Sequence, residues 1–241
     1  MDALIMAAGR GSRLAAETDG RPKSLVDLGG ISPLELQLDL LASRGVARVL
    51  VVTGYERGQV EAAVSGRLAP SMTAEFVWNP FWSVTNVIGS AWMARQHLST
   101  DFVYLHADTV FEPSILDDLL ASDADAALPI DLRECEPEQM KAALDGDRVT
   151  RLSKELPPAE TAGEFIGVGA FRAAAVPRIV DGIDAELAAG GLGSYFEAAL
   201  NRAIDAGLEV RSVPTAGRAW TEIDFPDDLA LARTLLPRLR P

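Results

Sequence analysis

Residues 3–14 of the chain read ALIMAAGRGSRL, so a short apolar run over Ala3–Ala7 leads directly into a glycine-rich loop. A buried strand that ends in such a loop can point several backbone N–H groups at one phosphate. Strand-like and helix-like segments then alternate through the first half of the chain. This βαβα order predicts an α/β fold, in which a mostly parallel sheet carries helices on both faces.

The expected elements of this half follow from apolar periodicity and capping signals. The sequence Ser32-Pro33-Leu34-Glu35 has the form of a capping box with proline at the first helical position. We expect strands over Ala3–Ala7, Val49–Val52, Ala74–Trp78 and Phe102–Leu105, and helices after Ser32 and over Glu56–Val64, Asn86–His97 and Pro113–Leu120. Ligands of such sheets gather beyond the carboxyl ends of the strands.

The chain changes in character after about residue 124, where short strands are separated by polar turns. We expect an antiparallel flap over about residues 125–171, packed over the site, within a single domain that spans residues 1–241. The elements expected here are strands over Ala126–Ile130, Arg148–Leu152 and Phe165–Phe171, helices at about 173–189 and 194–206, a strand over Glu209–Val213, an extended segment Trp220–Asp224 and a helix begun by Pro226.

The composition excludes several classes of protein. The net charge of −13 argues against a nucleic-acid partner, which needs a basic face to displace counterions. No apolar run reaches the roughly 18 residues that a membrane span needs, and the N-terminus has no basic stretch typical of a signal peptide. Cys135 is the only cysteine, which excludes an intrachain disulfide and favours a cytoplasmic location.

Basic residues gather at the glycine-rich loop. Of the 22 lysines and arginines, four lie between positions 10 and 23, among them Arg13 and Lys23. Lysine occurs only at positions 23, 141 and 154, although the chain otherwise favours arginine. Leu14 stands where the dinucleotide fingerprint needs a third glycine, and the P-loop signature is absent. The loop therefore predicts a phosphate site of another kind, with a plain βα turn as the alternative.

Carboxylates at two distant positions are candidate metal ligands. Asp108 follows the Phe102–Leu105 strand, and Glu222-Ile223-Asp224 places two acids on one side of an extended segment. A carboxylate at a strand end beside a phosphate site is where Mg2+ would be held. The alternative is that these acids cap turns or helices. A lysine of the flap, Lys154, is a candidate ligand of an acceptor's phosphate.

Taken together, the motifs resemble the nucleoside-triphosphate transferase superfamily, and within it the phosphocholine and phosphonate cytidylyltransferase group. The resemblance covers nearly the whole chain in seven ordered blocks. They are AAGRGSRL at 7–14, RPKSLVDLGG at 21–30, VVTGY at 51–55, NPFWSVTN at 79–86, LSKELPP at 152–158, GEFIGVGAF at 163–171 and WTEIDFPDDL at 220–229.

The resemblance implies that CTP loses pyrophosphate when an oxygen of a small phosphorylated acceptor attacks its α-phosphorus. It implies a role for each matching position: Ala7, Ala8, Gly9, Arg10, Gly11, Ser12 and Lys23 for the triphosphate, Arg13 with Lys23 for the departing pyrophosphate, Gly54, Tyr55, Asn86 and Ser90 for base and ribose, Asp108 and Asp224 for Mg2+, and Lys154 for the acceptor. The chain departs from the group's usual pattern at residues 86–89 and at His106, which leaves the acceptor open.

Three acceptors are considered. Phosphocholine would use the aromatic residues Phe76, Trp78, Phe81, Trp82 and Trp92, because aromatic faces bind quaternary ammonium groups. Packing of these rings in the core is the alternative, and the one that we favour. An aminoalkylphosphonate would need carboxylates such as Glu164, Glu197 or Glu222 near its amine, and a hydroxyalkylphosphonate would need neither.

Three other functions are weighed against this one. A sugar-1-phosphate nucleotidyltransferase would use UTP, dTTP or GTP, and a non-catalytic nucleotide-sensing subunit would be expected to lack Lys23 or the acids. An NAD-dependent oxidoreductase is disfavoured by the incomplete glycine fingerprint.

Overall fold

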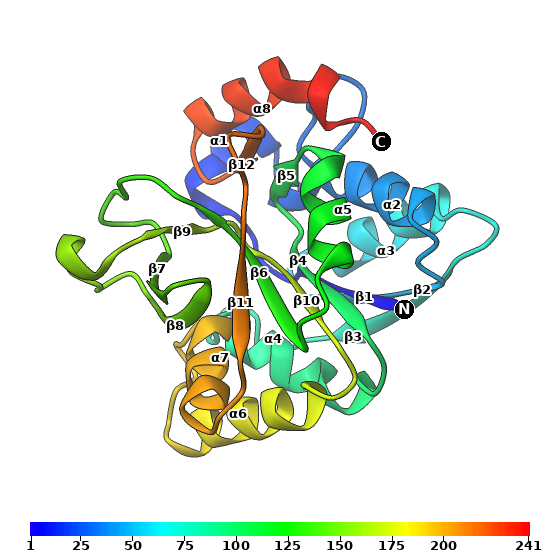
Figure 1. Cartoon of the computed structure of the whole chain (residues 1–241). Coiled ribbons are helices and arrows are strands. Elements are labelled where there is room, and N and C mark those ends of the chain that lie inside the picture. Colours follow the sequence, from blue (N-terminus) through cyan, green and yellow to red (C-terminus); the bar gives the residue numbers. More distant parts are fainter.

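The computed structural model describes the backbone of residues 1–241 and every side chain except that of Ala15. Its centre is a ten-stranded sheet with the order β11-β8-β7-β9-β6-β10-β4-β1-β2-β3 (Figure 1). The four strands at one end, β4 (Phe102–His106), β1 (Asp2–Ala7), β2 (Arg48–Thr53) and β3 (Thr73–Trp78), are all parallel. These are the four strands expected from the first half of the sequence, each extended by one or two residues.

The antiparallel part of the sheet begins at β10 (Val168–Phe171), which pairs with β4. It continues through β6 (Ala126–Asp131), β9 (Gly163–Phe165), β7 (Lys141–Asp145) and β8 (Arg148–Ser153). β11 (Val210–Pro214) pairs parallel with β6 and meets β8 antiparallel at Arg211. The segment expected as a flap therefore adds strands to the central sheet. One strand was expected over Phe165–Phe171, but the chain turns at Gly167, whose φ of 76° is left-handed, and two strands result.

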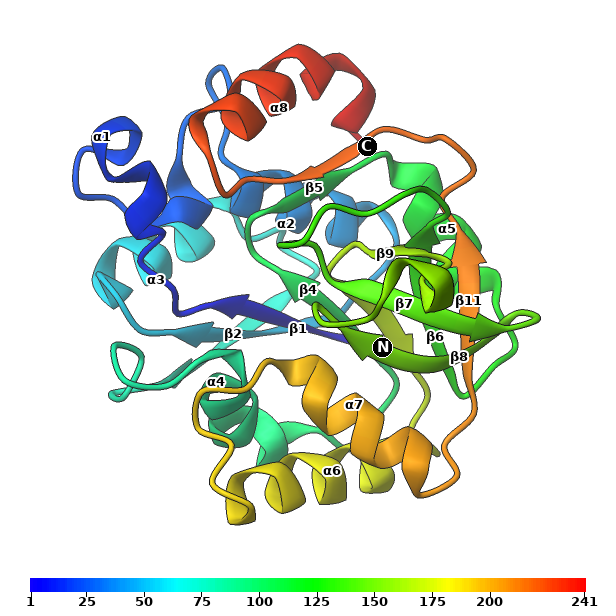
Figure 2. The same ribbon diagram turned by 90° about the vertical axis from the view of Figure 1, so that its left-hand side faces the viewer.

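Helices cover both faces of the sheet, as expected (Figure 2). One face carries α4 (Val87–Ala94), α6 (Val176–Ala188) and α7 (Phe196–Asp205), and the other carries α2 (Pro33–Ser43), α3 (Arg57–Arg67) and α5 (Pro113–Ala121). Side chains of β1 alternate between the two cores: Leu4 packs with the first set of helices and Ile5 with the second, both fully buried.

Local signals set several helix ends. The Ser32 hydroxyl accepts from the Glu35 N–H and the Glu35 carboxylate accepts from the Ser32 N–H, which confirms the capping box of α2. Asn86 caps α4, which passes at its end into the 3-10 turn η3 (Arg95–His97). The glycine-rich loop contains shorter pieces, namely η1 (Ser12–Leu14), α1 (Ala15–Thr18) and η2 (Lys23–Leu25), and the 3-10 turn η4 (Pro158–Glu160) follows β8.

A separate two-stranded sheet joins distant parts of the chain. β5 (Thr109–Phe111), directly after Asp108, pairs antiparallel with β12 (Trp220–Glu222), and the Ile223 N–H donates to the Asp108 carbonyl at 3.1 Å. The last helix, α8 (Pro226–Leu239), packs over this sheet through a third apolar cluster (Figures 1 and 2). Residues 108 and 224 are thereby brought to one place. Within the described residues, no helix combines the length and apolar character that crossing a membrane requires.

Candidate active site

A cavity of about 650 Å3 opens beyond the carboxyl ends of β1 and β4. The glycine-rich loop forms one wall, β12 and the start of α8 a second, and the antiparallel strands with the start of α7 a third. Eight carboxylates line the cavity, against four lysine or arginine side chains and one histidine. A site of this charge accepts a polyphosphate only together with additional cations.

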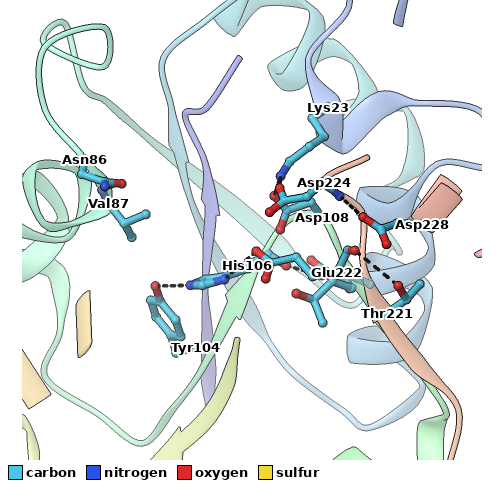
Figure 3. A network of polar contacts seen from close by, with 12 residues as sticks. Lys23, Asn86, Val87, Tyr104, His106, Asp108, Thr221, Glu222, Asp224 and Asp228 are labelled. Carbon is cyan, nitrogen blue, oxygen red and sulfur yellow. Dashed lines mark hydrogen bonds and ion pairs between the residues drawn. The ribbon is translucent and has the colours of Figure 1, made fainter. Parts of the chain in front are cut away.

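Lys23 joins the two candidate metal ligands. Its ammonium lies 2.6 Å from Asp108 Oδ2 and also contacts Asp224 Oδ1 (Figure 3). Burial would lower the pKa of Lys23, but the charges of Asp108 and Asp224 outweigh burial and raise it above its ordinary value. Lys23 comes this close to the loop because Gly11, at a φ of 71°, has no Cβ that would overlap it.

Asp108 keeps one oxygen unused. Its Oδ1 is buried and has no hydrogen-bond partner among the described residues. Burial raises the pKa of Asp108, and Lys23 opposes this effect. Among the described side chains, the potential ligand atoms that lie within 4.8 Å of one another belong to His106, Asp108 and Glu222. The expected pair of Asp108 and Asp224 meets instead through the ammonium of Lys23.

His106 is a site residue to which the sequence assigned no role. Its Nε2 lies 3.0 Å from the Tyr104 hydroxyl, and its Nδ1 lies 3.5 Å from Glu222 Oε1 (Figure 3). Burial would lower the pKa of His106, but the hydrogen bond and charge of Glu222 raise it to about 9. The carboxylate of Glu222 thus favours the protonated form of the ring. Its position two residues before Asp108, at a strand end, was the one signal for it in the sequence.

The residues expected to bind nucleotide divide into two groups. Ala7, Gly9, Gly11, Arg13, Lys23 and Asn86 line the cavity, whereas Ala8, Arg10, Ser12, Gly54, Tyr55 and Ser90 are not among its lining residues. Tyr55 supports the loop from behind, since its N–H donates to the Ala8 carbonyl at 3.0 Å and its hydroxyl donates to the Gly20 carbonyl at 3.1 Å. Ser90 is buried and accepts a hydrogen bond from Asn79.

All four residues expected at the acceptor line the cavity, in different electrostatic states. Glu164 is neutralised by Arg133, whose guanidinium lies 2.5 Å away. Glu197 is 2% exposed, and its Oε2 has no partner among the described residues. Burial raises the pKa of Glu197. Lys154 lies 4.0 Å from Glu138 and has its ammonium free for an anion.

The aromatic residues expected to bind phosphocholine lie elsewhere. Among the described residues that line the cavity, none belongs to the set Phe76, Trp78, Phe81, Trp82 and Trp92. Trp78 faces Arg57, Trp92 faces Arg95, and Trp82 packs edge-on against Tyr55. These rings therefore lie away from the cavity: Phe76, Trp82 and Trp92 pack against the apolar cores, as the core-packing alternative predicts, whereas Trp78 and Phe81 are exposed.

Other aromatic rings line the cavity. They are Phe165, Tyr195, Trp220 and Phe225. Tyr195 already faces Lys154, and Trp220 faces Arg133, at 5.0 and 5.3 Å from the ring centroids. A quaternary ammonium group would have to compete with these cations for the ring faces.

Comparison with known proteins finds a family of nucleotide transferases and several relatives in sequence. The family model described as MobA-like NTP transferase domain matches residues 3–166. The CMP-5'-(3-aminopropyl)phosphonate synthase of Streptomyces rubellomurinus is 32% identical over 237 residues, 94% of this chain and 37% of that protein. A bifunctional IPC transferase and DIPP synthase of Rubrobacter xylanophilus is 28% identical over 97% of this chain and 51% of that protein. The chain thus spans about half or less of the length of these two relatives.

A solved structure shows the same fold. The CTP:phosphocholine cytidylyltransferase of Streptococcus pneumoniae superimposes with a TM-score of 0.80 over 98% of both chains, at 23% sequence identity. At this identity the likeness concerns the arrangement of helices and strands, including the Rossmann-like parallel half.

Proposed function

The chain belongs to the family of MobA-like NTP transferase domains, and from this premise we propose that it transfers CMP from CTP to a small phosphorylated or phosphonate acceptor. An oxygen of the acceptor's phosphate or phosphonate forms a bond to the α-phosphorus. The bond between the α-phosphorus and the pyrophosphate oxygen breaks, and pyrophosphate leaves. The acceptor oxygen is already ionised, so the protein need not supply a base.

One observation carries this proposal: Asp108 and Asp224 meet at Lys23, opposite the glycine-rich loop. The three groups come from segments far apart in the sequence. The pairing of β5 with β12 and a shared apolar cluster that includes Val26, Val110 and Ile223 bring these segments together. A nucleotide whose triphosphate lies along the loop would put its α-phosphorus beside both carboxylates. The carboxylates of Asp108, Glu222 and Asp224 repel one another, and the single ammonium of Lys23 does not balance all three. This excess of negative charge supports a site for a metal cation together with a phosphate.

The carboxylates suit a magnesium ion. The free Oδ1 of buried Asp108 is a hard oxygen donor, and Asp224 is close enough to share one cation with Asp108, as both share Lys23. We propose that Asp108 and Asp224 hold Mg2+, with Glu222 near enough to assist. When bound, the ion would neutralise charge on the triphosphate and on the attacking oxygen.

The basic residues then have distinct tasks. Arg13 and Lys23 border the loop end of the cavity and would stabilise the negative charge of the departing pyrophosphate. Lys154, which directly follows β8 and approaches Glu138 at 4.0 Å, would bind the acceptor's phosphate or phosphonate. The two groups of charge would hold the reactants in line across the metal site.

We propose further that the acceptor carries a primary ammonium group. Glu197 offers a buried carboxylate oxygen without a partner, while Glu164 is already neutralised by Arg133. A hydrogen-bonding ammonium would satisfy Glu197, whereas a quaternary group could not donate to it. The aminopropylphosphonate named for the Streptomyces relative is a compound of this class.

The test is a panel of triphosphates and acceptors, scored by release of pyrophosphate. The triphosphates are CTP, UTP, dTTP and GTP. The acceptors are 2-aminoethylphosphonate, phosphoethanolamine, phosphocholine, 2-hydroxyethylphosphonate and a hexose 1-phosphate. We expect turnover with CTP and the two primary amines. Turnover with only the sugar phosphate would instead support a sugar-1-phosphate nucleotidyltransferase, and binding of CTP without release of pyrophosphate would support a nucleotide sensor.

The variant Glu197→Gln separates the ammonium proposal from the reaction itself. Loss of one partner of a buried charge pair costs about 2–5 kcal/mol, so kcat/KM for 2-aminoethylphosphonate should fall by roughly 30-fold or more. The kcat/KM of the variant for 2-hydroxyethylphosphonate, which has no amine, should stay within about threefold of the wild-type value. An equal fall for both compounds would remove Glu197 from the acceptor site.

A further inference from the structure

The chain has three lysines, and Lys141 is the one that the proposed reaction does not use. Its side chain is buried, with 5% of its surface exposed, and it is not among the residues that line the cavity. A buried ammonium is costly unless its protons are satisfied, and it is usually paired with a carboxylate. Lys141 has different partners: its Nζ donates to the Pro137 carbonyl at 3.0 Å and to the Lys154 carbonyl.

One of these carbonyls belongs to the segment that precedes β7, and the other to the residue that follows β8. Pro137 lies in a turn that is closed by the Gln139 N–H donating to the Glu136 carbonyl at 3.2 Å. Glu136, Glu138, Gln139 and Met140 of this turn line the cavity. Lys154 lines it from the end of β8, where β7 pairs Lys141 with Ser153.

The residue type matches this position. An ammonium is compact and can direct its protons to two carbonyls that lie at different angles. A guanidinium is planar and needs more room, so arginine, which this chain otherwise favours, would not make the same two contacts in a buried place. An apolar side chain would leave both carbonyl oxygens without the donor that now holds them.

We propose that Lys141 is a positioning residue for acceptor binding. Through its two hydrogen bonds it sets the place of Lys154 and of the turn over residues 136–140 relative to each other. The glycine-rich loop meets this turn in one exposed ion pair, between Arg13 and Glu138 at 3.9 Å, and neither hydrogen bond of Lys141 reaches that loop or Asp108. The kinetic part of this proposal rests on the proposed function, and its structural part does not.

The first test is kinetic and uses Lys141→Met, which keeps an unbranched side chain, one atom shorter than lysine, and removes the donor. We expect KM for the acceptor to rise at least about tenfold, while kcat and KM for CTP stay within about threefold. Thr150→Val is the matched control, because Thr150 donates to the Ala143 carbonyl at 3.1 Å in the same hairpin. The control should leave the acceptor KM unchanged. An equal rise of both KM values, or the same rise in the control, would overturn the proposal.

The second test needs no activity. Backbone hydrogen exchange should become faster over residues 136–140 and around Lys154 in Lys141→Met, and it should stay unchanged over residues 2–14. Wild-type exchange rates over residues 136–140 and around Lys154 would overturn the proposal, whatever the acceptor is. If Lys141→Met does not fold, Lys141→Arg takes the place of that variant in both tests, because arginine keeps the buried positive charge. Wild-type acceptor KM and exchange in a folded Lys141→Arg protein would then contradict it.

Discussion

Replacing Lys23 by methionine tests the centre of the site, because one ammonium there balances two carboxylates. In Lys23→Met, Asp108 and Asp224 lose their shared partner while Glu222 remains close to Asp108. The side chain of Lys23 is 13% exposed and that of Asp108 is 18% exposed, so water compensates for little of this loss. We therefore expect a less stable protein, which a divalent cation should stabilise again.

The magnitude follows from the burial of the pair. Removal of one partner from a buried ion pair costs about 3–5 kcal/mol. Asp224 is 35% exposed and therefore partly screened, so we take the lower end, about 3 kcal/mol. For a chain of this length, 1 kcal/mol corresponds to about 2–4 °C in Tm, so the melting temperature should fall by roughly 6–12 °C. Magnesium at 100 times its Kd would restore about 2.7 kcal/mol.

The assay is thermal unfolding of both proteins with and without Mg2+, together with pyrophosphate release. Magnesium should raise Tm more in Lys23→Met than in the wild type, because in the wild type the ion competes with Lys23 for the same carboxylates. Lys154→Met is the control for loss of a positive charge at the cavity, since its nearest carboxylate is 4.0 Å away. A Tm of Lys23→Met within about 2 °C of the wild type, or an equal effect of Mg2+ on both, would refute this reasoning.

Three further predictions concern single positions. Asp108→Asn should lower turnover at least ~100-fold in the pyrophosphate assay, as loss of a key electrostatic group does, and near-normal activity would contradict its assignment. Gly11→Ala should destabilise the fold by more than the roughly 1–2 kcal/mol of a left-handed backbone, because its Cβ would also overlap Lys23. Denaturant unfolding measures this, and an unchanged midpoint would show that the loop adapts. Glu186→Gln should cost about 2 kcal/mol near pH 7, since the hydrogen bond from Ser194 lowers the pKa of Glu186 below its ordinary 4.5. A lowered pKa gives stability that is present above pH 4.5 and lost as the pH falls through the folded value, so unfolding curves of wild type and variant should converge in acid. A constant gap down to pH 3 would exclude this origin of the stability.

The parallel half of the fold could be predicted because its signals are local. The apolar run at Ala3–Ala7, the capping box at Ser32 and the β-branched run at Val49–Val52 each depend on residues close in sequence. The antiparallel half was predicted less completely. β7 was not foreseen, and the strand over Phe165–Phe171 is divided because Gly167 turns the chain toward two different neighbours.

The candidate site shows the same limit. Lys23, Asp108 and Asp224 were recognised by residue type and by their place after strands or loops, and they do lie together. His106 was left without a role, because the raised pKa of His106 depends on Glu222, which lies 116 residues away in the sequence. For the aromatic residues of the 76–92 segment two roles were left open, since ring clustering in sequence does not say which face of the sheet receives the rings.

The amino-acid sequence by itself determined the order of strands and helices in the parallel half, the glycine-rich loop after the first strand and the kinds of ionisable group available to the site. Only the tertiary structure decided that β12 pairs with β5, that Glu164 pairs with Arg133 while Oε2 of Glu197 has no partner among the described residues, and that Lys141 donates to the carbonyls of Pro137 and Lys154. The physical reason is range. Propensities and caps act over a few residues, whereas the meeting of residues 23, 108 and 224 depends on how α8 buries its apolar side against the loop and β5.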